Sequence, residues 1–183
     1  DGAFVQRALL EPAFAAGLRD ESAFRRAVQD AAGAHRIARL ELVPRTEPGE
    51  WIEVRGRTVD AEGAPLAGVR VHVFATDADG RYHPTLDGER TPRIFGTVVS
   101  DDAGRFEIAT VRPGPYPGTR NAIHLHVQAR KHALRLAAPG YVVFDDDPLL
   151  AEPQNAEPRG EALAIAMRSE AGRAVGELTL PLR

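Results

Sequence analysis

The pattern of hydrophobic and polar positions changes along the chain near residue 50. Beyond this point apolar and polar side chains alternate, as in "VRVHVFA" at 69–75, where the valines and Ala75 would face one way and the other residues the opposite way. A period of two is typical of a strand that buries one face. The pattern predicts short strands at 51–59, 69–75, 95–99, 105–110, 122–130, 133–137, 141–144, 162–168 and 174–182.

Three Asp-x-x-Gly segments separate these strands, at Asp60–Gly63, Asp77–Gly80 and Asp101–Gly104. In such a turn the Asp side chain binds the backbone ahead of it, and the Gly supplies a positive φ. The unequal spacing of the three segments indicates hairpin turns and not a structural repeat. Many short strands with frequent turns predict a mostly β protein, an antiparallel β-sandwich with a helical N-terminal segment.

Residues 1–38 have a helical pattern instead. Apolar residues recur at helical spacing in "DESAFRRAVQDAAG", which ends at Gly33, and "LVPRTEPGEW" at 42–51 resembles a linker. We therefore expect a helical N-terminal segment and linker over 1–45 and a β-sandwich domain over 46–183. The helices would dock on the β domain or join copies of the chain into a homo-oligomer.

With 183 residues the chain can form one sizeable core. Its 23 basic and 26 acidic residues give a net charge of -3 without any Lys/Arg run, so no nucleic-acid partner is expected. No apolar stretch reaches the roughly 18 residues that span a bilayer, so we expect a soluble protein without a membrane partner. The chain begins at Asp1, so a cytoplasmic location and export after loss of an N-terminal segment both stay open.

The chain contains no cysteine, so a metal ion would have to be held by His, Tyr, Asp or Glu. His124 and His126 would share one face of a strand, roughly 7 Å apart at Cα, a spacing at which two imidazoles can bind one ion. Leu125 between them would enter the core. Alone, such a pair is more typical of a solvated strand face.

Two of the three tyrosines stand in rigid loops. Tyr82 follows the turn in "DADGRY", and Tyr116 lies between prolines in "RPGPYPG". Rings at these positions suit core packing poorly, although they could cover an edge of the sandwich. A phenol has a pKa of about 10, but a trivalent cation can remove its proton. Two phenolates and two imidazoles suit ferric iron better than zinc or magnesium, with one position open for an exogenous ligand.

The segments "VFATDADGRY", "RIFGTVVSDDAGRFEIATVRPGPYPG", "IHLHV" and "VVFDDDPLL", in this order, resemble the intradiol ring-cleavage dioxygenases. The resemblance covers roughly residues 50–182 and implies a β-sandwich with one Fe(III) per chain, held by Tyr82, Tyr116, His124 and His126. It also implies that O2 cleaves a catechol-type ring between its two hydroxylated carbons to give a muconate-type diacid. The substrate would displace Tyr116, whose phenolate would take up a catechol proton.

Two positions depart from the family pattern. The family has an arginine three residues before its first histidine, whereas here that position is Asn121 and Arg120 stands one residue further away. A shift of one residue turns a strand side chain to the other face, so Arg120 would either stabilise the anionic substrate or face solvent. Tyr141 takes the place of a family glutamine.

Further residues are weaker candidates for the pocket. His83 could line it and Arg93 could meet a substrate carboxylate, although a surface histidine and a surface ion pair are the alternatives. The "DDD" run at 145–147 is expected to be a solvated turn, and "AEPQNAEPRGEA" at 151–162 to lie over the surface.

Two other functions stay open. The opening from Val54 to Gly68 also resembles transthyretin-like and carboxypeptidase-associated β-sandwich modules, which bind without catalysis and do not need the tyrosines and histidines. An iron-binding relative with altered chemistry would keep the four ligands but lose intradiol cleavage through the changes at Arg120 and Tyr141.

Overall fold

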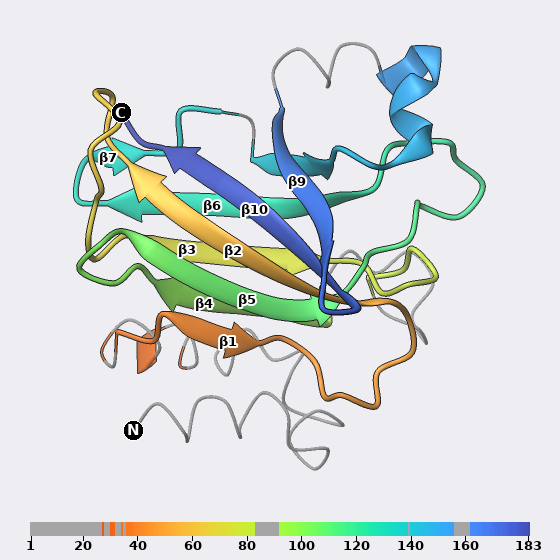
Figure 1. Cartoon of the computed structure of the whole chain (residues 1–183), viewed down its shortest axis with the longest axis horizontal. Helices are drawn as coiled ribbons and strands as arrows, with labels where there is room; N and C mark the ends of the chain where they lie inside the picture. Colours follow the sequence, from red (N-terminus) through yellow and green to blue (C-terminus); the bar gives the residue numbers. More distant parts are fainter. Residues whose placement is uncertain are drawn as a thin grey trace.

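A computed structural model describes residues 36–82, 92–138, 140–155 and 162–183, together with Ala27, Asp30, Ala31 and Ala34. The described part is mostly β, as predicted (Figure 1). Each predicted strand is present, with its ends shifted by a few residues. The strands are β1 (Arg39–Glu41), β2 (Trp51–Val59), β3 (Arg70–Ala75), β4 (Ile94–Val99), β5 (Arg105–Val111), β6 (His124–Lys131), β7 (Leu134–Arg135), β8 (Tyr141–Phe144), β9 (Leu163–Glu170) and β10 (Arg173–Pro181), and two short 3-10 helices follow β8 at η1 (Pro148–Ala151) and η2 (Pro153–Asn155).

The strands form one continuous path in the order β1-β5-β2-β10-β9-β8-β6-β3-β4, with β7 paired to β6. β9 joins the two halves, because it pairs with β10 on one side and with β8 on the other. The two ends of the path approach each other: a Cβ placed on Gly96 of β4 would lie 2.6 Å from Leu40 Cδ2 of β1. The sheet therefore wraps into a nearly closed, barrel-like layer around its core.

The predicted antiparallel sandwich is correct only in part. Six of the strand pairings are antiparallel, but β1–β5, β2–β10 and β8–β9 are parallel. Side chains alternate between faces in the same way in both kinds of ladder, so the sequence pattern does not report the direction of the neighbouring strand.

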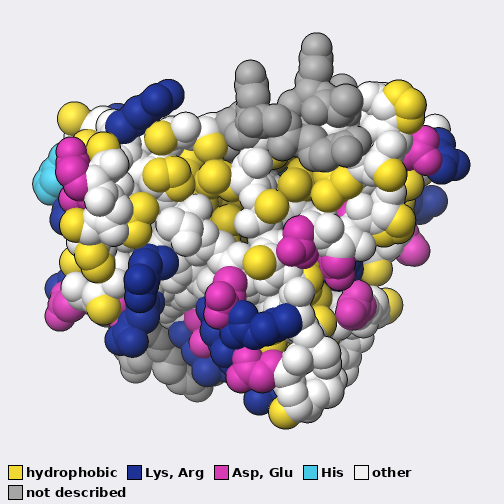
Figure 2. Space-filling view, turned by 45° about the horizontal axis from the view of Figure 1, so that its top comes forward, with side chains coloured by type: hydrophobic (Ala, Val, Ile, Leu, Met, Phe, Trp, Pro, Cys, Tyr) yellow, Lys and Arg dark blue, Asp and Glu magenta, His cyan; other side chains and the backbone are white. Residues whose placement is uncertain are grey.

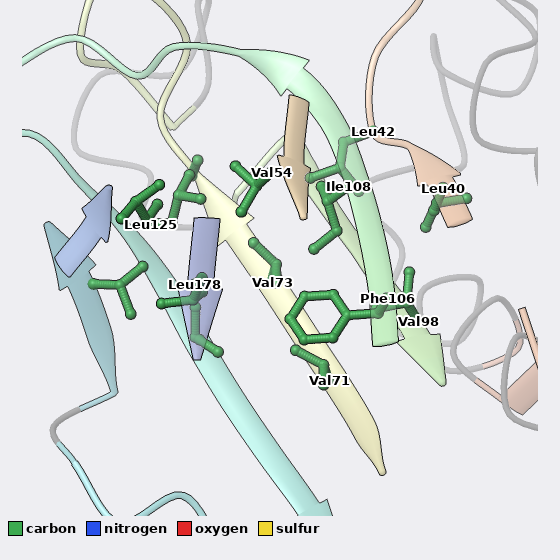
Figure 3. Close-up of a cluster of buried hydrophobic side chains, with 14 of the residues drawn as sticks. Leu40, Leu42, Val54, Val71, Val73, Val98, Phe106, Ile108, Leu125 and Leu178 are labelled. Carbon is green, nitrogen blue, oxygen red and sulfur yellow. The ribbon is translucent and has the colours of Figure 1, made fainter. Parts of the chain in front are cut away.

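The core lies between the two halves of the sheet (Figure 3). Val71 and Val73 of β3 point into it, and Leu125 of β6 joins them with an exposed fraction of 1%. Phe106 of β5 fills the space opposite Gly56 of β2, its partner in the ladder, where a Cβ would lie 1.9 Å from the ring. The aromatic ring thus covers a strand glycine that has no side chain to pack.

All three Asp-x-x-Gly turns are confirmed. Asp60 and Asp101 each accept two backbone N–H groups through a carboxylate oxygen, and so does Asp77. Gly63 and Gly104 have φ values of 84° and 73°, the left-handed region that favours glycine. The turn chemistry is therefore as predicted, but only the turn after β3 lies between strands that pair with each other, β3 and β4. The other two turns join strands that are not neighbours in the sheet, so the prediction of hairpins is wrong for them.

The β core begins earlier than the sequence indicates. β1 lies in the segment assigned to the N-terminal region, and Leu40, Leu42 and Val43 are fully buried although the last two were expected in a linker. A three-residue strand is too short to show an alternation, which explains why it was missed. Ala27, Asp30, Ala31 and Ala34 have helical backbone, and the rest of the predicted N-terminal helical segment lies outside the described residues.

Among the described residues, no helix has the length and apolarity that a bilayer span requires.

We predict that Leu42→Ala lowers the free energy of unfolding by about 2–5 kcal/mol, because it opens a cavity in the closed end of the core. The neighbouring exposed substitution Thr46→Ala should change it by less than about 0.5 kcal/mol. Urea denaturation of both variants measures the difference. Equal stabilities would show that the segment before residue 46 does not belong to the core.

Candidate metal centre

Four side chains from three segments meet at one end of β6. The Tyr82 hydroxyl lies 2.6 Å from the Tyr116 hydroxyl and 2.8 Å from Nε2 of His126. The Tyr116 hydroxyl lies 3.1 Å from Nε2 of His124 and 3.3 Å from that of His126. All four side chains are half-buried. The structure thus brings together the four residues that the sequence singled out.

β6 presents its two histidines as the alternation predicts. His124 and His126 point away from the core on one face, and Leu125 points into it. The ring of His126 stacks on Phe74, with centroids 4.4 Å apart and planes 5° from parallel. Nδ1 of His124 lies 2.9 Å from the Ala122 carbonyl, which can only accept, so this nitrogen carries the proton. In the neutral ring, Nε2 of His124 then has the lone pair, and it faces the Tyr116 hydroxyl.

Burial, together with the smaller effect of the neighbouring His124, lowers the pKa of His126 to about 4. The imidazole is consequently neutral at neutral pH, the form that binds a metal ion. No group of three His, Asp or Glu side chains gathers anywhere in the described part of the chain, so any further donors at this place are the two phenols.

The geometry fits a small metal ion. A cavity of about 10 Å³ lies between the four side chains and is closed by Thr76, Gly114, Pro115 and Ala122. Ligand atoms at roughly 2 Å from one ion lie roughly 2.8–3.4 Å from each other, which is the range spanned by most of the contacts above. Two neutral imidazoles with two phenolates supply two negative charges, a set that suits a trivalent cation.

The two tyrosine loops are packed backbone against backbone. The Gly114 amide donates to the Asp77 carbonyl at 2.8 Å. A Cβ on Gly114 would lie 2.1 Å from the Ala78 carbonyl oxygen, and a Cβ on Gly80 would lie 1.8 Å from the Pro115 carbonyl oxygen. Only glycine fits at both positions, so the two hydroxyls can approach because neither loop has a side chain between them.

Arg93 supports the loop of Tyr82 from behind. Its amide donates to the Tyr82 carbonyl at 2.9 Å, and its guanidinium binds Glu47, with Nη1 at 3.0 Å from Oε2. The same guanidinium lies 3.8 Å from Oδ2 of Asp77. Arg93 was a candidate for binding a substrate carboxylate, but the structure places it against these two carboxylates and outside the cavity lining.

Arg120 points away from the four side chains. It is exposed to 67% and pairs with Glu152 on the surface. Its backbone carbonyl accepts bonds from the side chains of Gln154 and Asn155. Of the two orientations that the sequence left open, the structure shows the one facing solvent.

Tyr141 lies beside the centre. Its ring meets that of His124 edge-on with centroids 5.7 Å apart, and β8 places it opposite His126 in the ladder. Tyr141 can therefore lie beside a molecule bound at the centre, although it does not line the cavity between the four side chains. His83, the remaining pocket candidate, lies outside the described residues.

Two anchoring residues were missed by sequence reasoning. Asp147 and Asn155 are each only 3% exposed, although their segments were expected at the surface. Asp147 accepts the Ile123 amide at 2.6 Å, and Asn155 accepts the Ala122 amide at 3.1 Å. They fix the chain immediately before His124. The one local signal was Asp147 before Pro148, which is typical of a helix cap.

Comparison with known proteins places the chain in a family. Residues 24–177 match the family described as Dioxygenase. The protocatechuate 3,4-dioxygenase beta chain of Burkholderia cepacia is 33% identical over 115 residues, which cover 56% of this chain and 48% of the relative. The 6-chlorohydroxyquinol 1,2-dioxygenase of Cupriavidus pinatubonensis is 33% identical over 85 residues, which cover 46% and 31%. The chain spans half or less of the length of these relatives.

A solved structure agrees with this assignment. The dioxygenase domain of a dioxygenase carbohydrate-binding protein fusion from Streptomyces sp. SirexAA-E superposes with a TM-score of 0.63 at 25% identity, over 77% of this chain and 84% of that domain. The chain therefore belongs to the intradiol dioxygenase family, as its motifs predicted.

We predict that Gly114→Ala weakens ferric-ion binding at least tenfold, because the new methyl group would push the two tyrosine loops apart. Gly140→Ala is the matched control, since its Cβ would lie 3.6 Å from the Val127 carbonyl oxygen, an ordinary contact. Titration of the metal-free protein with ferric ion, followed by absorption, measures both. Unchanged binding in Gly114→Ala would show that the close packing of these loops is not required.

Proposed function

We propose that this chain is a non-haem Fe(III) intradiol dioxygenase that acts on a catechol-type ring. The observation that carries the proposal is the meeting of two phenol oxygens and two imidazole nitrogens around a cavity, joined by four contacts of 2.6–3.3 Å. The reaction would combine one catechol with one O2, break the ring bond between the two hydroxylated carbons, and place both oxygen atoms in a muconate-type diacid.

The four side chains have separate roles in this proposal. Tyr82, Tyr116, His124 and His126 hold the iron, which when bound supplies the redox and Lewis-acid chemistry that activates a catechol toward O2. Tyr116 would give way to the substrate, and its phenolate oxygen would accept a proton from a catechol hydroxyl. The loop of Tyr116 favours this role, because the residues before and after Tyr116 are both exposed. Tyr82 instead follows a turn that is held by hydrogen bonds to the Asp77 carboxylate.

The surroundings would orient and shield the substrate. Tyr141 flanks His124, and Phe74 covers one face of His126 by stacking, which keeps the ring from rotating. Both side chains present aromatic rings. We therefore infer that the part of the pocket they form favours an aromatic substrate over a strongly polar one.

The orientation of Arg120 favours a second candidate, an iron-binding relative with altered chemistry. A preorganised donor that stabilises a developing anion contributes about 10²–10³-fold in rate. Arg120 makes its contacts with Glu152, Gln154 and Asn155 instead. The non-catalytic binding module finds less support, because such a module has no need for the four converging side chains. Self-association through the N-terminal helices stays a prediction.

We predict that the protein loaded with ferric ion is red-brown, because phenolate ligands give charge-transfer absorption, and that it consumes O2 with catechol. Tyr116→Phe should weaken the visible band and lower kcat by about 10²–10⁴-fold, the usual contribution of a proton acceptor. Tyr141→Phe is the matched control for the spectrum and should keep the band. Metal analysis, the visible spectrum and an oxygen electrode test the proposal, and colourless protein after iron loading would refute it.

The role of Arg120 can be tested separately. If its side chain stays with Glu152, Arg120→Gln should lower kcat/KM for catechol less than about threefold, as should Arg105→Gln at another exposed ion pair. Product spectra from both variants report whether cleavage remains intradiol. A loss of about 10²-fold confined to Arg120→Gln would instead show that Arg120 turns inward to stabilise the substrate anion.

A further inference from the structure

We propose that the outer face of β3, β6 and β7 holds a second binding site, for a small oxyanion, which does not depend on the proposed ring-cleavage activity. The site lies toward the end of β6 that is opposite to the metal centre (Figure 1). It is formed by three arginines that stand next to one another on neighbouring strands: Arg70, Arg130 and Arg135.

Strand register brings the three arginines together. Arg70 of β3 is the direct partner of Arg130 on β6, and Arg130 is the direct partner of Arg135 on β7. Direct partners point to the same face with Cβ atoms roughly 5 Å apart. Like charges at this separation repel each other and destabilise the sheet. A bound negative charge would therefore stabilise three guanidinium groups in a row.

No carboxylate of the described part forms an ion pair with these three arginines. Within the described part of the chain, Arg70 and Arg130 form no ion pair or hydrogen bond through their side chains. Nη1 of Arg135 donates to two carbonyl groups of its own hairpin, of His132 at 2.6 Å and of Leu134 at 2.9 Å. Asp30 lines the same cavity, but it forms no ion pair with any of the three.

Several other arginines of the described part have carboxylate partners. Arg55 binds Glu53 and Glu170, and Arg168 binds Glu177. Figure 2 shows this intermixing of basic and acidic side chains on the face turned to the viewer. Arg57 also forms no ion pair with a described residue, so Arg70 and Arg130 are distinguished by their place in a row of three arginines at one cavity.

A cavity lies directly on the arginines. It has a volume of about 540 Å³, and its lining combines the three arginines with His72, Thr97 and Gln128. His72 and Gln128 are direct partners in the next row of the ladder, and Nδ1 of His72 lies 3.1 Å from the Thr97 hydroxyl. Guanidinium forks bind carboxylate and phosphate oxygens in pairs, and the neighbouring amide can donate to a remaining oxygen.

The site is separate from the metal centre. His126 and Arg130 lie on the same face of β6, four residues and roughly 13 Å apart. The row of Phe74 and His126 is followed by the row of His72 and Gln128, and only then by the arginines. An oxyanion held by the arginines would therefore not touch the four side chains at the centre. Phosphate and a dicarboxylate share the required chemistry, so the experiment tests both.

The test measures binding of inorganic phosphate and of muconate to the purified protein by titration calorimetry at low ionic strength. We expect at least one of the two anions to bind the wild-type protein, and Arg130→Gln and Arg70→Gln each to raise its Kd at least tenfold. The control is Arg57→Gln, because Arg57 is also exposed and also lies opposite an arginine, Arg105, in its strand pair. This variant should keep the Kd within twofold of the wild-type value. The same anion should raise the melting temperature of the wild type and of Arg57→Gln but not of the other two variants.

Binding of phosphate alone would identify an inorganic anion site, and binding of muconate alone a carboxylate site, and either supports the proposal. It is overturned if neither anion produces heat or a shift in melting temperature, or if both arginine variants bind as the wild type does. The measurement uses neither O2 nor catechol, so it is independent of the outcome for the proposed dioxygenase activity.

Discussion

Two hydroxyl groups on separate loops lie 2.6 Å apart, and the contact between those loops is the constraint on which the candidate centre depends. Asp77 forms hydrogen bonds with both loops. Its carboxylate holds the turn that ends at Tyr82, and its carbonyl accepts the amide of Gly114, which leads to Tyr116. Because Gly80 and Gly114 have no side chains, the backbones of the two loops are in contact. The positions of the two phenol groups therefore depend on hydrogen bonds of the main chain and not on the rotation of long side chains.

The histidine half of the centre is positioned by a different kind of contact. Leu125 is buried in the core between His124 and His126, so the packing of one face of β6 holds the ligands on the other. A shift of β6 by one residue would place Leu125 outside and both histidines in the core, which the hydrophobic core does not permit. Stacking on Phe74 and the bond to the Ala122 carbonyl then orient the two rings. The stability of the core and the geometry of the centre therefore depend on the same strand.

The sequence was sufficient where the deciding interactions are local. The alternation of side chains predicted the strands, the Asp-x-x-Gly pattern predicted the turns, and the motifs around Tyr82 and His124 predicted which side chains would meet. It was insufficient where partners are distant in the chain. The three residues of β1 and the parallel pairing of β2 with β10 depend on contacts across the whole sheet. Asp147 and Asn155 similarly look like surface residues until the segment before His124 is placed against them.

The segment from Arg120 to His124 shows how one anchoring arrangement has two consequences. Asp147 and Asn155 bind the backbone just before His124, and this keeps the Nδ1 of that histidine beside the Ala122 carbonyl with Nε2 facing the tyrosines. Asn155 also binds the Arg120 carbonyl, so the same bonds hold the start of the segment at the surface. The ion pair with Glu152 is exposed and weak by comparison, since water and salt screen it. The backbone anchors therefore place the main chain of Arg120 at the surface, and its side chain pairs there with Glu152 instead of pointing to the centre.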